Sequence, residues 1–380
     1  MSYHDILDTD LPFVSILIPM HNEEKVADQI LLALIDQEYP KDKMEIIPIN
    51  DHSTDSTQNI LEKYAKIYSF IKPLHRLGKE PRGKPASLND ALKLARGDIV
   101  VIYDADYIPP KGQLREIVIN FVDPEVGAVM GRVVPVNTSR NLLTRLLDLE
   151  RAGGYQVDQQ ARYNLDLIAQ YGGTVGAFRK DLVLRFGGFD EKILAEDTEL
   201  TFKLYVNGYK VIYANRAECY EESPEDWKVR ARQIRRWSQG HNQVLFKYLF
   251  PLWLSNLTLW QKIDGTLLLF IYIIPFLFLL GIVDSIILFF LGEMEILSVF
   301  WIFITLIAYN SYGNFAPFFQ MGVAGFLDGV GERLRLLPFF YFIFLFNAWY
   351  TSLGFLDALK TLLTGERPIW HKTERFRNNG

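Results

Sequence analysis

The sequence predicts an α/β fold with a mostly parallel sheet covered by helices, followed by a transmembrane helical region. Two observations support this prediction. Along residues 1–265, short apolar runs rich in strand-forming residues alternate with segments of helical periodicity. From residue 266 the charge almost disappears, since only 9 of the 98 residues in 266–363 are charged, against 22% of the whole chain.

The front half supplies the elements of the sheet. Apolar runs predict strands at residues 13–19, 44–50 and 98–103, and helical spacing predicts helices at 25–36, 54–67 and 86–95. Sheets of this kind bind ligands at the carboxyl ends of their strands. Neither a GxGxxG after the first strand nor a GxxxxGK[ST] occurs, so a dinucleotide fold and a P-loop both lack their main signal.

Three apolar segments of the back half are long enough to cross a hydrocarbon core about 30 Å thick. They are residues 266–291, 296–318 and 336–359. The stretch 321–335 mixes Gly, Phe, Leu and Arg and is expected to lie in the membrane interface, as is a helix region at 241–265.

Charge near these segments predicts their orientation. Arg333 and Arg335 place the link before the third segment on the side of the front half. The start of the chain lacks the features of a signal peptide, so we expect a multi-pass cell-membrane protein with a cytosolic front half. Three full crossings place the basic tail, 364–380, outside; either the tail breaks the charge rule, or the third segment re-enters or lies flat.

Composition excludes several classes of protein. The single cysteine, Cys219, excludes a disulfide framework, a thiolate zinc site and a CxxC redox centre. The six histidines form no HExxH motif. A net charge of −5 without blocks of Lys and Arg argues against nucleic acid as a partner.

Two carboxylates, Asp104 and Asp106, follow the strand predicted at 98–103. Their spacing at a strand end suits a single hard cation, Mg²⁺ or Mn²⁺, which prefers oxygen ligands. Such a cation neutralises a diphosphate leaving group. The alternative is a pair of solvated turn residues.

A second acidic pair, Glu196 and Asp197, opens the amphipathic stretch 198–206. A carboxylate at a helix start can act as a general base toward a hydroxyl within hydrogen-bond reach. The alternative is that Asp197 caps the helix and interacts with its dipole.

Basic and aromatic residues mark two further places. Lys84, after Gly83 and before a helix, is suited to phosphate, although a surface lysine is the simpler interpretation. Trp237 lies in an arginine cluster that includes Arg236, and it either faces a sugar ring or anchors the chain at a membrane surface.

Taken together, these motifs resemble family-2 glycosyltransferases with the GT-A fold. The matching elements are Pro19 with Asn22-Glu23-Glu24, Asn50-Asp-His-Ser-Thr-Asp55, Gly83-Lys84, Asp104-Ala-Asp106, Gly172-Gly-Thr174 through Arg179, Glu196-Asp197, Gln233-Ile-Arg-Arg-Trp237 and Trp370-His-Lys-Thr-Glu-Arg375. The Q-x-x-R-W element is similar to that of the membrane-bound subgroup containing cellulose, chitin, hyaluronan and poly-N-acetylglucosamine synthases and ceramide glucosyltransferase.

The resemblance implies a GT-A catalytic domain, with a Rossmann-like mixed sheet, over residues 1–240. It implies a nucleotide-diphosphate sugar as donor, with a family leaning to UDP, and Mg²⁺ or Mn²⁺ on Asp104 and Asp106. Asp197 is the implied base and Glu196 the next candidate. The residues implied to bind substrate or nucleotide are Pro19, Asn22, Glu23, Asp51, Ser53, Lys84, Asp104, Gly173, Thr174, Gln233, Arg236 and Trp237.

Three residues depart from the family pattern. Asn50 stands where the family usually has its first Asp, and His52 where Gly is usual. The nucleotide loop is therefore expected to be reshaped, with Asp51 carrying base recognition. Ala195 replaces the Thr common before Glu-Asp, which the chemistry tolerates because the carboxylate accepts the proton.

The expected function is that of a membrane-bound inverting glycosyltransferase whose acceptor is a lipid or a growing saccharide, in contact with membrane lipids. A processive polysaccharide synthase with export is the rival within the enzyme class, and the small number of predicted spans favours a short product. Outside that class, a transporter would need polar residues within its spans, where only Asp284 qualifies. A non-catalytic scaffold or export partner would be expected to lose some of Asp104, Asp106, Asp197 or Trp237, and all are present.

Overall fold

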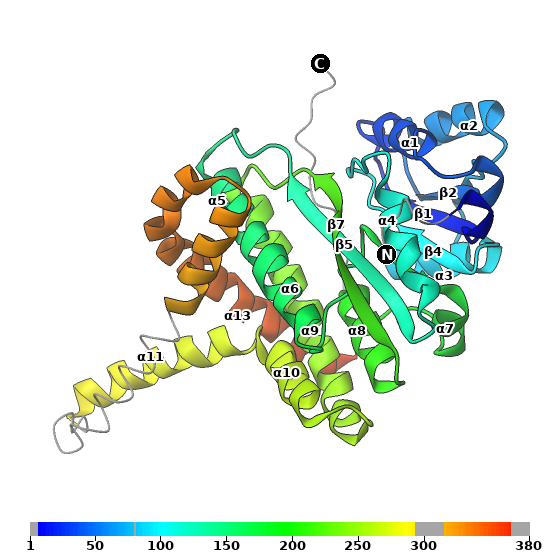
Figure 1. Cartoon of the computed structure of the whole chain (residues 1–380). Helices are drawn as coiled ribbons and strands as arrows, with labels where there is room; N and C mark the ends of the chain where they lie inside the picture. The colour runs from blue at the N-terminus through cyan, green and yellow to red at the C-terminus, as the bar shows by residue number, and fades with distance from the viewer. Residues whose placement is uncertain (1–6, 80, 293–314, 366–380) are drawn as a thin grey trace.

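The structure, a computed structural model, describes residues 7–79, 81–292 and 315–365 (Figure 1). Its centre is a mixed sheet of seven strands in the order β3-β2-β1-β4-β6-β5-β7. The strands are β1 (Val14–Met20), β2 (Met44–Asp51), β3 (Leu74–Arg76), β4 (Ile99–Ile102), β5 (Val126–Pro135), β6 (Gly176–Arg179) and β7 (Lys210–Glu221). Strands β1 to β4 run parallel, and β6 runs antiparallel to its neighbours β4 and β5.

Helices connect the parallel strands, as the sequence predicts. They are α1 (Ala27–Ile35), α2 (Thr57–Ile67) and α3 (Lys84–Leu94). The three predicted strands are confirmed as β1, β2 and β4, and the predicted helices as these three. Because β1, β2 and β4 are parallel neighbours, the loops that follow them meet at one edge of the sheet.

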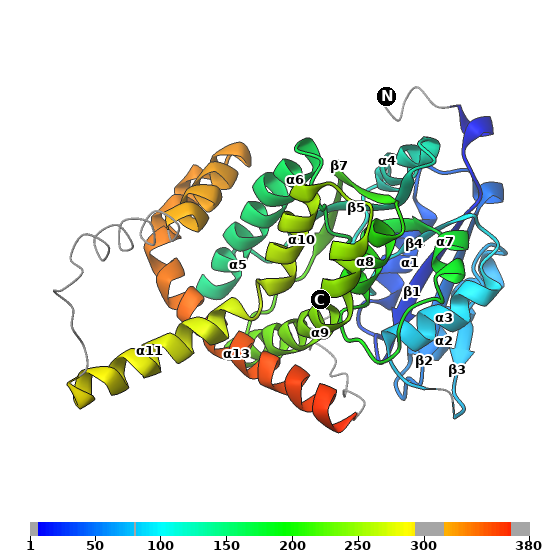
Figure 2. The same ribbon diagram turned by 90° about the horizontal axis from the view of Figure 1, so that it is seen from below.

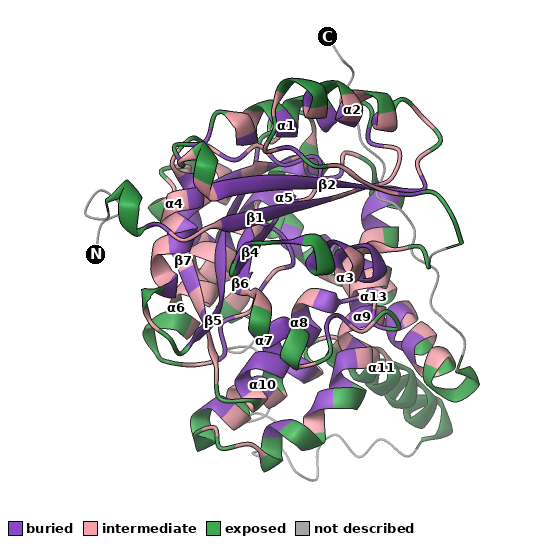
Figure 3. Ribbon diagram, turned by 90° about the vertical axis from the view of Figure 1, so that its right-hand side faces the viewer, coloured by how far each residue is buried: buried purple, intermediate pink, exposed green. Residues whose placement is uncertain are grey.

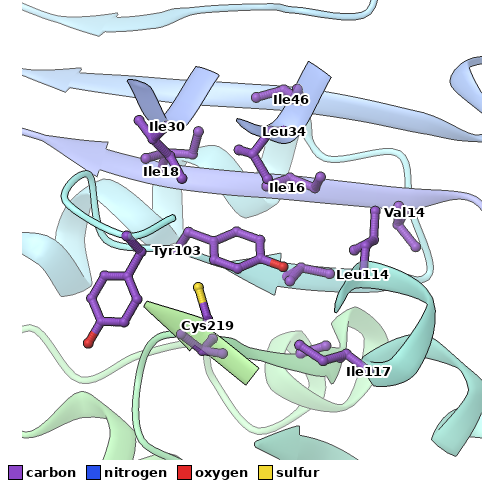
Figure 4. Packing of buried hydrophobic residues seen from close by; sticks show 14 of the residues in the cluster. Val14, Ile16, Ile18, Ile30, Leu34, Ile46, Tyr103, Leu114, Ile117 and Cys219 are labelled. Carbon is purple, nitrogen blue, oxygen red and sulfur yellow. The ribbon is translucent and has the colours of Figure 1, made fainter. Parts of the chain in front are cut away.

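The sheet is buried on both faces (Figure 3). Side chains alternate along β1, so that Ile16 and Ile18 join the cluster under α1 while Leu17 joins the cluster on the other face. The first cluster also contains Tyr103 and Cys219, which lie side by side between β1 and α4 (Gln113–Val118) (Figure 4). The lone cysteine is therefore a core residue.

The rest of the chain is mainly helical. The helices are α5 (Leu142–Ala152), the π-helical segment Gly153–Gln159, α6 (Gln160–Asn164), α7 (Lys180–Arg185), α8 (Glu196–Val206), α9 (Trp227–Leu254), α10 (Leu259–Phe270), α11 (Ile274–Leu291), Phe315–Leu327, the 3₁₀ segment Gly331–Phe339 and α13 (Phe340–Thr364). The stretch predicted to be interfacial, 321–335, is thus divided between two helical segments.

Helix α9 connects the back half of the chain to the front half. It runs without a break through residue 240, the end expected for the front domain, and through most of 241–265. A Cβ on Gly240 would lie 2.5 Å from the backbone N of Ala195, so only glycine allows α9 to approach the start of α8 this closely. On its other side, Ser238 donates to the carbonyl of Thr351 in α13 at 2.6 Å.

The apolar segments differ from the prediction in detail. Residues 266–291 do not form one helix, because α10 ends at Phe270 and α11 starts again at Ile274. Pro275, at the first turn of α11, lacks the N–H that a continuous helix needs. The segment predicted at 336–359 corresponds to α13 and the 3₁₀ segment before it.

Two helical stretches of the described residues, Ile274–Leu291 and Gly331–Thr364, are long and apolar enough to cross a membrane. None of the side chains of α11 is buried, and the helix extends away from the body of the molecule (Figure 2). Most of the span predicted at 296–318 and of the tail at 364–380, with its Trp370 motif, lies outside the described residues.

Candidate active site

A pocket of about 1030 Å³ opens at the carboxyl ends of β1, β2 and β4. Of the residues predicted from the sequence, twelve line it: Pro19, Glu23, Asp51, Lys84, Asp104, Asp106, Thr174, Glu196, Asp197, Gln233, Arg236 and Trp237. Three others support its wall. Asn22 accepts from Thr54 N–H at 2.7 Å, and its own N–H donates to Ser53 Oγ, so these residues join the loops after β1 and β2. Gly173, with φ of +73°, packs against Asp197, where a Cβ would lie 2.9 Å from the Asp197 Cβ.

The loop after β2 is fixed by Asp51. Its carboxylate accepts from Gly83 N–H at 2.9 Å and from the Arg76 guanidinium, and lies 2.8 Å from His52 Nδ1. His52 has a φ of +58°, which explains in physical terms why glycine suits this position. Asn50 Oδ1 accepts from Ser53 N–H at 3.2 Å, a contact that an aspartate at this position would also make.

Lys84 joins the two acidic motifs. Its ammonium lies 2.9 Å from Asp104 Oδ1 and 3.1 Å from Glu196 Oε1, and it donates to the carbonyl of Gly173 at 2.9 Å. Burial lowers the pKa of Lys84, but the charges of Asp104 and Glu196 outweigh this effect and raise it. Lys84 is therefore a permanently charged residue of the pocket rather than a surface lysine.

Asp104 and Asp106 both face the pocket, and the Thr174 hydroxyl lies beside them, since its Oγ1 accepts from Asp104 N–H at 3.0 Å. Asp106 is only 4% exposed, whereas the Asp104 side chain is 32% exposed. The donor set consists of oxygens, which fits Mg²⁺ or Mn²⁺. Within residues 7–79, 81–292 and 315–365, no three His, Cys, Asp or Glu side chains are arranged as a metal site.

Asp197 does not cap α8. Helix α8 begins at Glu196, so its N-cap residue is Ala195. The side chain of Ala195 makes no capping hydrogen bond. Asp197 instead lies in the first turn, where its Oδ1 accepts from Thr198 N–H at 2.6 Å. Burial raises the pKa of Asp197 above that of an ordinary aspartate, although Thr198 N–H, Lys84 and Arg236 act in the opposite direction. Asp197 is therefore not the N-cap residue, but its place in the first turn agrees with the predicted dipole interaction, and it faces the pocket as a carboxylate with a raised pKa.

The Q-x-x-R-W residues form the opposite wall, on α9. Two guanidinium groups lie over the Trp237 ring, with Arg151 Cζ 5.4 Å and Arg230 Cζ 5.3 Å from its centroid. Arg151 in turn donates to Glu221 Oε1 at 2.7 Å, and Gln233 Oε1 accepts from Arg230 at 2.9 Å. Cation–π contacts with these two arginines, which are themselves held by polar partners, therefore hold the indole in place.

The far end of the pocket is apolar and comes from later elements. Leu268 on α10 and Ile271 and Tyr272 in the turn before α11 line it, together with His241 on α9. The His241 and Tyr272 rings are 4.3 Å apart, and His241 Nε2 lies 3.1 Å from Thr198 Oγ1. Burial lowers the pKa of His241 to about 4. The pocket thus extends from the strand ends to the start of a helix long enough to span a membrane.

The family described as glycosyltransferase-like family 2 matches residues 12–240. The chain belongs to glycosyltransferase family 2. It is 39% identical over 244 residues to the probable glycosyltransferase YdaM of Bacillus subtilis, over 63% of this chain and 58% of that protein. It is 31% identical over 246 residues to the beta-monoglucosyldiacylglycerol synthase of Nostoc sp., over 65% of this chain and 52% of that protein. The chain thus spans little more than half the length of these curated relatives.

Among solved structures, this family-2 glycosyltransferase shares its fold with the mannosyltransferase PcManGT from Pyrobaculum calidifontis, determined in complex with GDP-Man and Mn²⁺. The TM-score is 0.61 at 22% identity, and the match covers 93% of this chain and 88% of that one. The fold is thus a GT-A-like mixed α/β sheet.

Sequence reasoning about this glycosyltransferase missed one side of the pocket. The lining residues Arg151, Tyr155, Arg162 and His241 belong to no motif considered. A signal was present for some of them: Gly153-Gly154 within a helical stretch marks the π-helical segment, and π-helical turns occur often at functional sites. No comparable local signal marks His241.

Proposed function

We propose that this protein is a membrane-bound inverting glycosyltransferase of the Q-x-x-R-W subgroup, which moves one hexose from a nucleotide-diphosphate sugar to a lipid acceptor. A single observation carries the proposal. One pocket joins the carboxylates and Lys84 at the strand ends to the apolar residues Leu268 and Ile271 beside the start of α11. A charged donor and a lipid acceptor can therefore meet inside it.

The donor lies at the strand ends. Asp51 and the loop after β2 take the nucleotide, with a UDP-sugar as the expected donor, while Lys84 and Arg236 face the diphosphate. Asp104 and Asp106 would hold Mg²⁺ or Mn²⁺, which would supply positive charge to neutralise the diphosphate. The mannosyltransferase of related fold, in complex with GDP-Man and Mn²⁺, supports this arrangement.

The transfer is a single displacement. The acceptor hydroxyl oxygen forms a bond to the anomeric carbon, while the bond from that carbon to the diphosphate oxygen breaks and the nucleoside diphosphate leaves with the electron pair. Asp197 accepts the hydroxyl proton, a role suited to a carboxylate whose pKa burial raises. Lys84 and Arg236 stabilise the charge that builds on the leaving group. Because attack and departure occur on opposite faces, the configuration inverts.

The acceptor approaches from the membrane side. Trp237, which lines the pocket beside Arg151 and Arg230, offers indole surface to the sugar or headgroup, and Leu268 and Ile271 offer apolar contact to a lipid chain. A relative described as a beta-monoglucosyldiacylglycerol synthase suggests diacylglycerol as the first acceptor to test. We further propose that the protein lies in the cell membrane with several spans and with its catalytic domain in the cytosol, as the charges beside the apolar segments predict.

The test is product analysis. The purified protein in lipid nanodiscs is incubated with radiolabelled UDP- and GDP-sugars, with or without diacylglycerol, and the products are extracted into organic solvent and sized. We expect label in one lipid-soluble product, and only when diacylglycerol is present. A ladder or a high polymer would show a processive polysaccharide synthase instead, and no product with any donor would contradict the proposal.

A further inference from the structure

A second pocket, of about 440 Å³, lies outside the active site. It forms where the loop after β5, the first turn of α5 and the 3₁₀ segment Gly331–Phe339 meet. Its lining consists of Thr138, Ser139, Arg145, Glu332, Arg333, Arg335 and Leu336. Three guanidinium groups and two hydroxyls therefore converge on one space, opposed by a single lining carboxylate.

Of the three arginines that line this second pocket, one forms an ion pair among the residues that the structure describes. Arg333 pairs with Asp148 of α5. Arg145 and Arg335 are exposed, and among the residues that the structure describes neither forms an ion pair. Two guanidiniums thus stay available to an external anion, and guanidinium groups bind phosphate oxygens in a planar, bidentate way.

The frame around the second pocket is rigid. Asn141 caps α5, with its Oδ1 accepting from Thr144 N–H at 3.0 Å and its N–H donating to Thr144 Oγ1 at 3.1 Å. Beneath, Leu146 and Leu149 of α5 pack against Phe340 and Ile343 of α13. The hydroxyl-bearing loop and the two arginine-bearing segments are therefore held at fixed positions before any ligand arrives.

The surroundings favour a ligand with apolar chains. Leu142, in the first turn of α5, is 46% exposed, and Phe339 and Phe342 at the start of α13 are 46% and 67% exposed. Phe339 and Phe342 belong to the stretch Gly331–Thr364, which is long and apolar enough to cross a membrane. Basic residues at such a boundary attract the anionic headgroups of the cytoplasmic leaflet.

We propose that this second pocket binds the phosphate headgroup of an anionic phospholipid, with Arg145, Arg335 and the hydroxyls of Thr138 and Ser139 on the phosphate and the lipid chains along the start of α13. The site is distinct from the sugar-transfer pocket and does not require that transfer to occur. It fixes the boundary of α13 against the membrane surface that surrounds it.

The test uses the full chain in a neutral detergent. Short-chain dioctanoyl phosphatidylglycerol, dioctanoyl phosphatidylcholine and inorganic phosphate are titrated by calorimetry into the wild type and into Arg145→Gln/Arg335→Gln. Arg333 is kept because it pairs with Asp148. The matched control, Arg185→Gln/Arg216→Gln, removes the same charge from exposed positions outside both pockets.

We expect the wild type and the control to bind phosphatidylglycerol at least tenfold more tightly than phosphatidylcholine, and the Arg145/Arg335 variant to lose that preference while it melts at the same temperature. Equal binding of the two lipids by the wild type, no lipid binding, or an unchanged preference in the variant would overturn the proposal. Inorganic phosphate binding as tightly as phosphatidylglycerol would assign the pocket to a free anion and overturn the lipid assignment. These titrations measure lipid binding and not sugar transfer. Failure of the proposed sugar transfer is therefore detected by a separate experiment.

Discussion

The two sides of the active-site pocket are built in different ways. The donor side comes from loops that follow neighbouring parallel strands, and short hydrogen bonds such as Gly83 N–H to Asp51 bind these loops to one another. The acceptor side comes from α9, α10 and the π-helical segment, which are far apart in the chain and held by ring contacts and ion pairs. The positions of the donor-side residues are therefore determined by the order of neighbouring strands, whereas those of the acceptor-side residues depend on how helices pack.

Replacing Asp197, which lies between the donor side and the acceptor side of the pocket, should have the largest effect on turnover. In Asp197→Asn the amide keeps the shape of the side chain but cannot take the acceptor's proton. We expect turnover to fall by about 10²–10⁴ while donor affinity stays within a few-fold of wild type. Radiolabel transfer and donor titration measure the two quantities.

The control for this substitution is Asp181→Asn, on α7 outside the pocket. It should leave both quantities unchanged. Near-normal transfer by Asp197→Asn would remove Asp197 as the base and make Glu196, which shares the Lys84 contact, the next candidate.

Removing the cation should lower the affinity of the donor side for the nucleotide sugar and leave the acceptor side unaffected. With EDTA, we expect affinity for the nucleotide sugar to fall about tenfold or more and to return with Mn²⁺ or Mg²⁺, because Asp104 and Asp106 then face the diphosphate without a neutralising charge. Asp106→Asn should reproduce part of the loss. Full donor affinity in chelator would contradict the metal role.

The acceptor side should respond to Trp237→Leu. Loss of the indole surface beside Arg151 and Arg230 should raise the acceptor KM about tenfold and leave donor affinity unchanged. Trp227→Leu serves as the matched control, since Trp227 begins α9 and lies outside the pocket. An equal loss of donor affinity in Trp237→Leu would show that the two sides are not separable.

The smallest expected effect is a loss of folding stability at acidic pH. The pKa of His241 is lowered to about 4 in the folded protein, below the ordinary value, so the unfolded chain binds the proton more readily. The stability from neutral His241 is complete above pH 6.5 and is lost as the pH falls toward 4. Between pH 7 and 5.5 we expect His241 to account for about 1 kcal/mol of lost unfolding free energy.

Denaturant unfolding at several pH values, compared between the wild type and His241→Asn, measures this contribution. The variant should show a shallower loss over the same range. Parallel pH profiles of the two proteins would mean that His241 does not supply the acid sensitivity of the acceptor side.

Much of the donor side was predictable from particular residues. The runs at 13–19, 44–50 and 98–103 identify β1, β2 and β4, and parallel pairing then brings the residues after them to one edge. The meeting of Lys84 with Asp104 and Glu196 was not predictable, because it joins residues separated by as many as 112 positions (196 − 84). Nor did the apolar pattern of 266–291 reveal the interruption between α10 and α11, although Pro275 is a local cause of it.

The sequence by itself determined the order of strands and helices in the front half, the carboxylates at the strand ends and the low charge of the back half, because each depends on residues close together in the chain. Only the tertiary structure decided that Trp237 lies beside Arg151 and Arg230, that Asp197 lines the pocket from the first turn of α8, and that His241 contacts Tyr272. These contacts depend on the angles and depths at which helices pack. The shapes of many side chains together determine these angles and depths. One example is Gly240, whose lack of a Cβ allows α9 to lie close to Ala195.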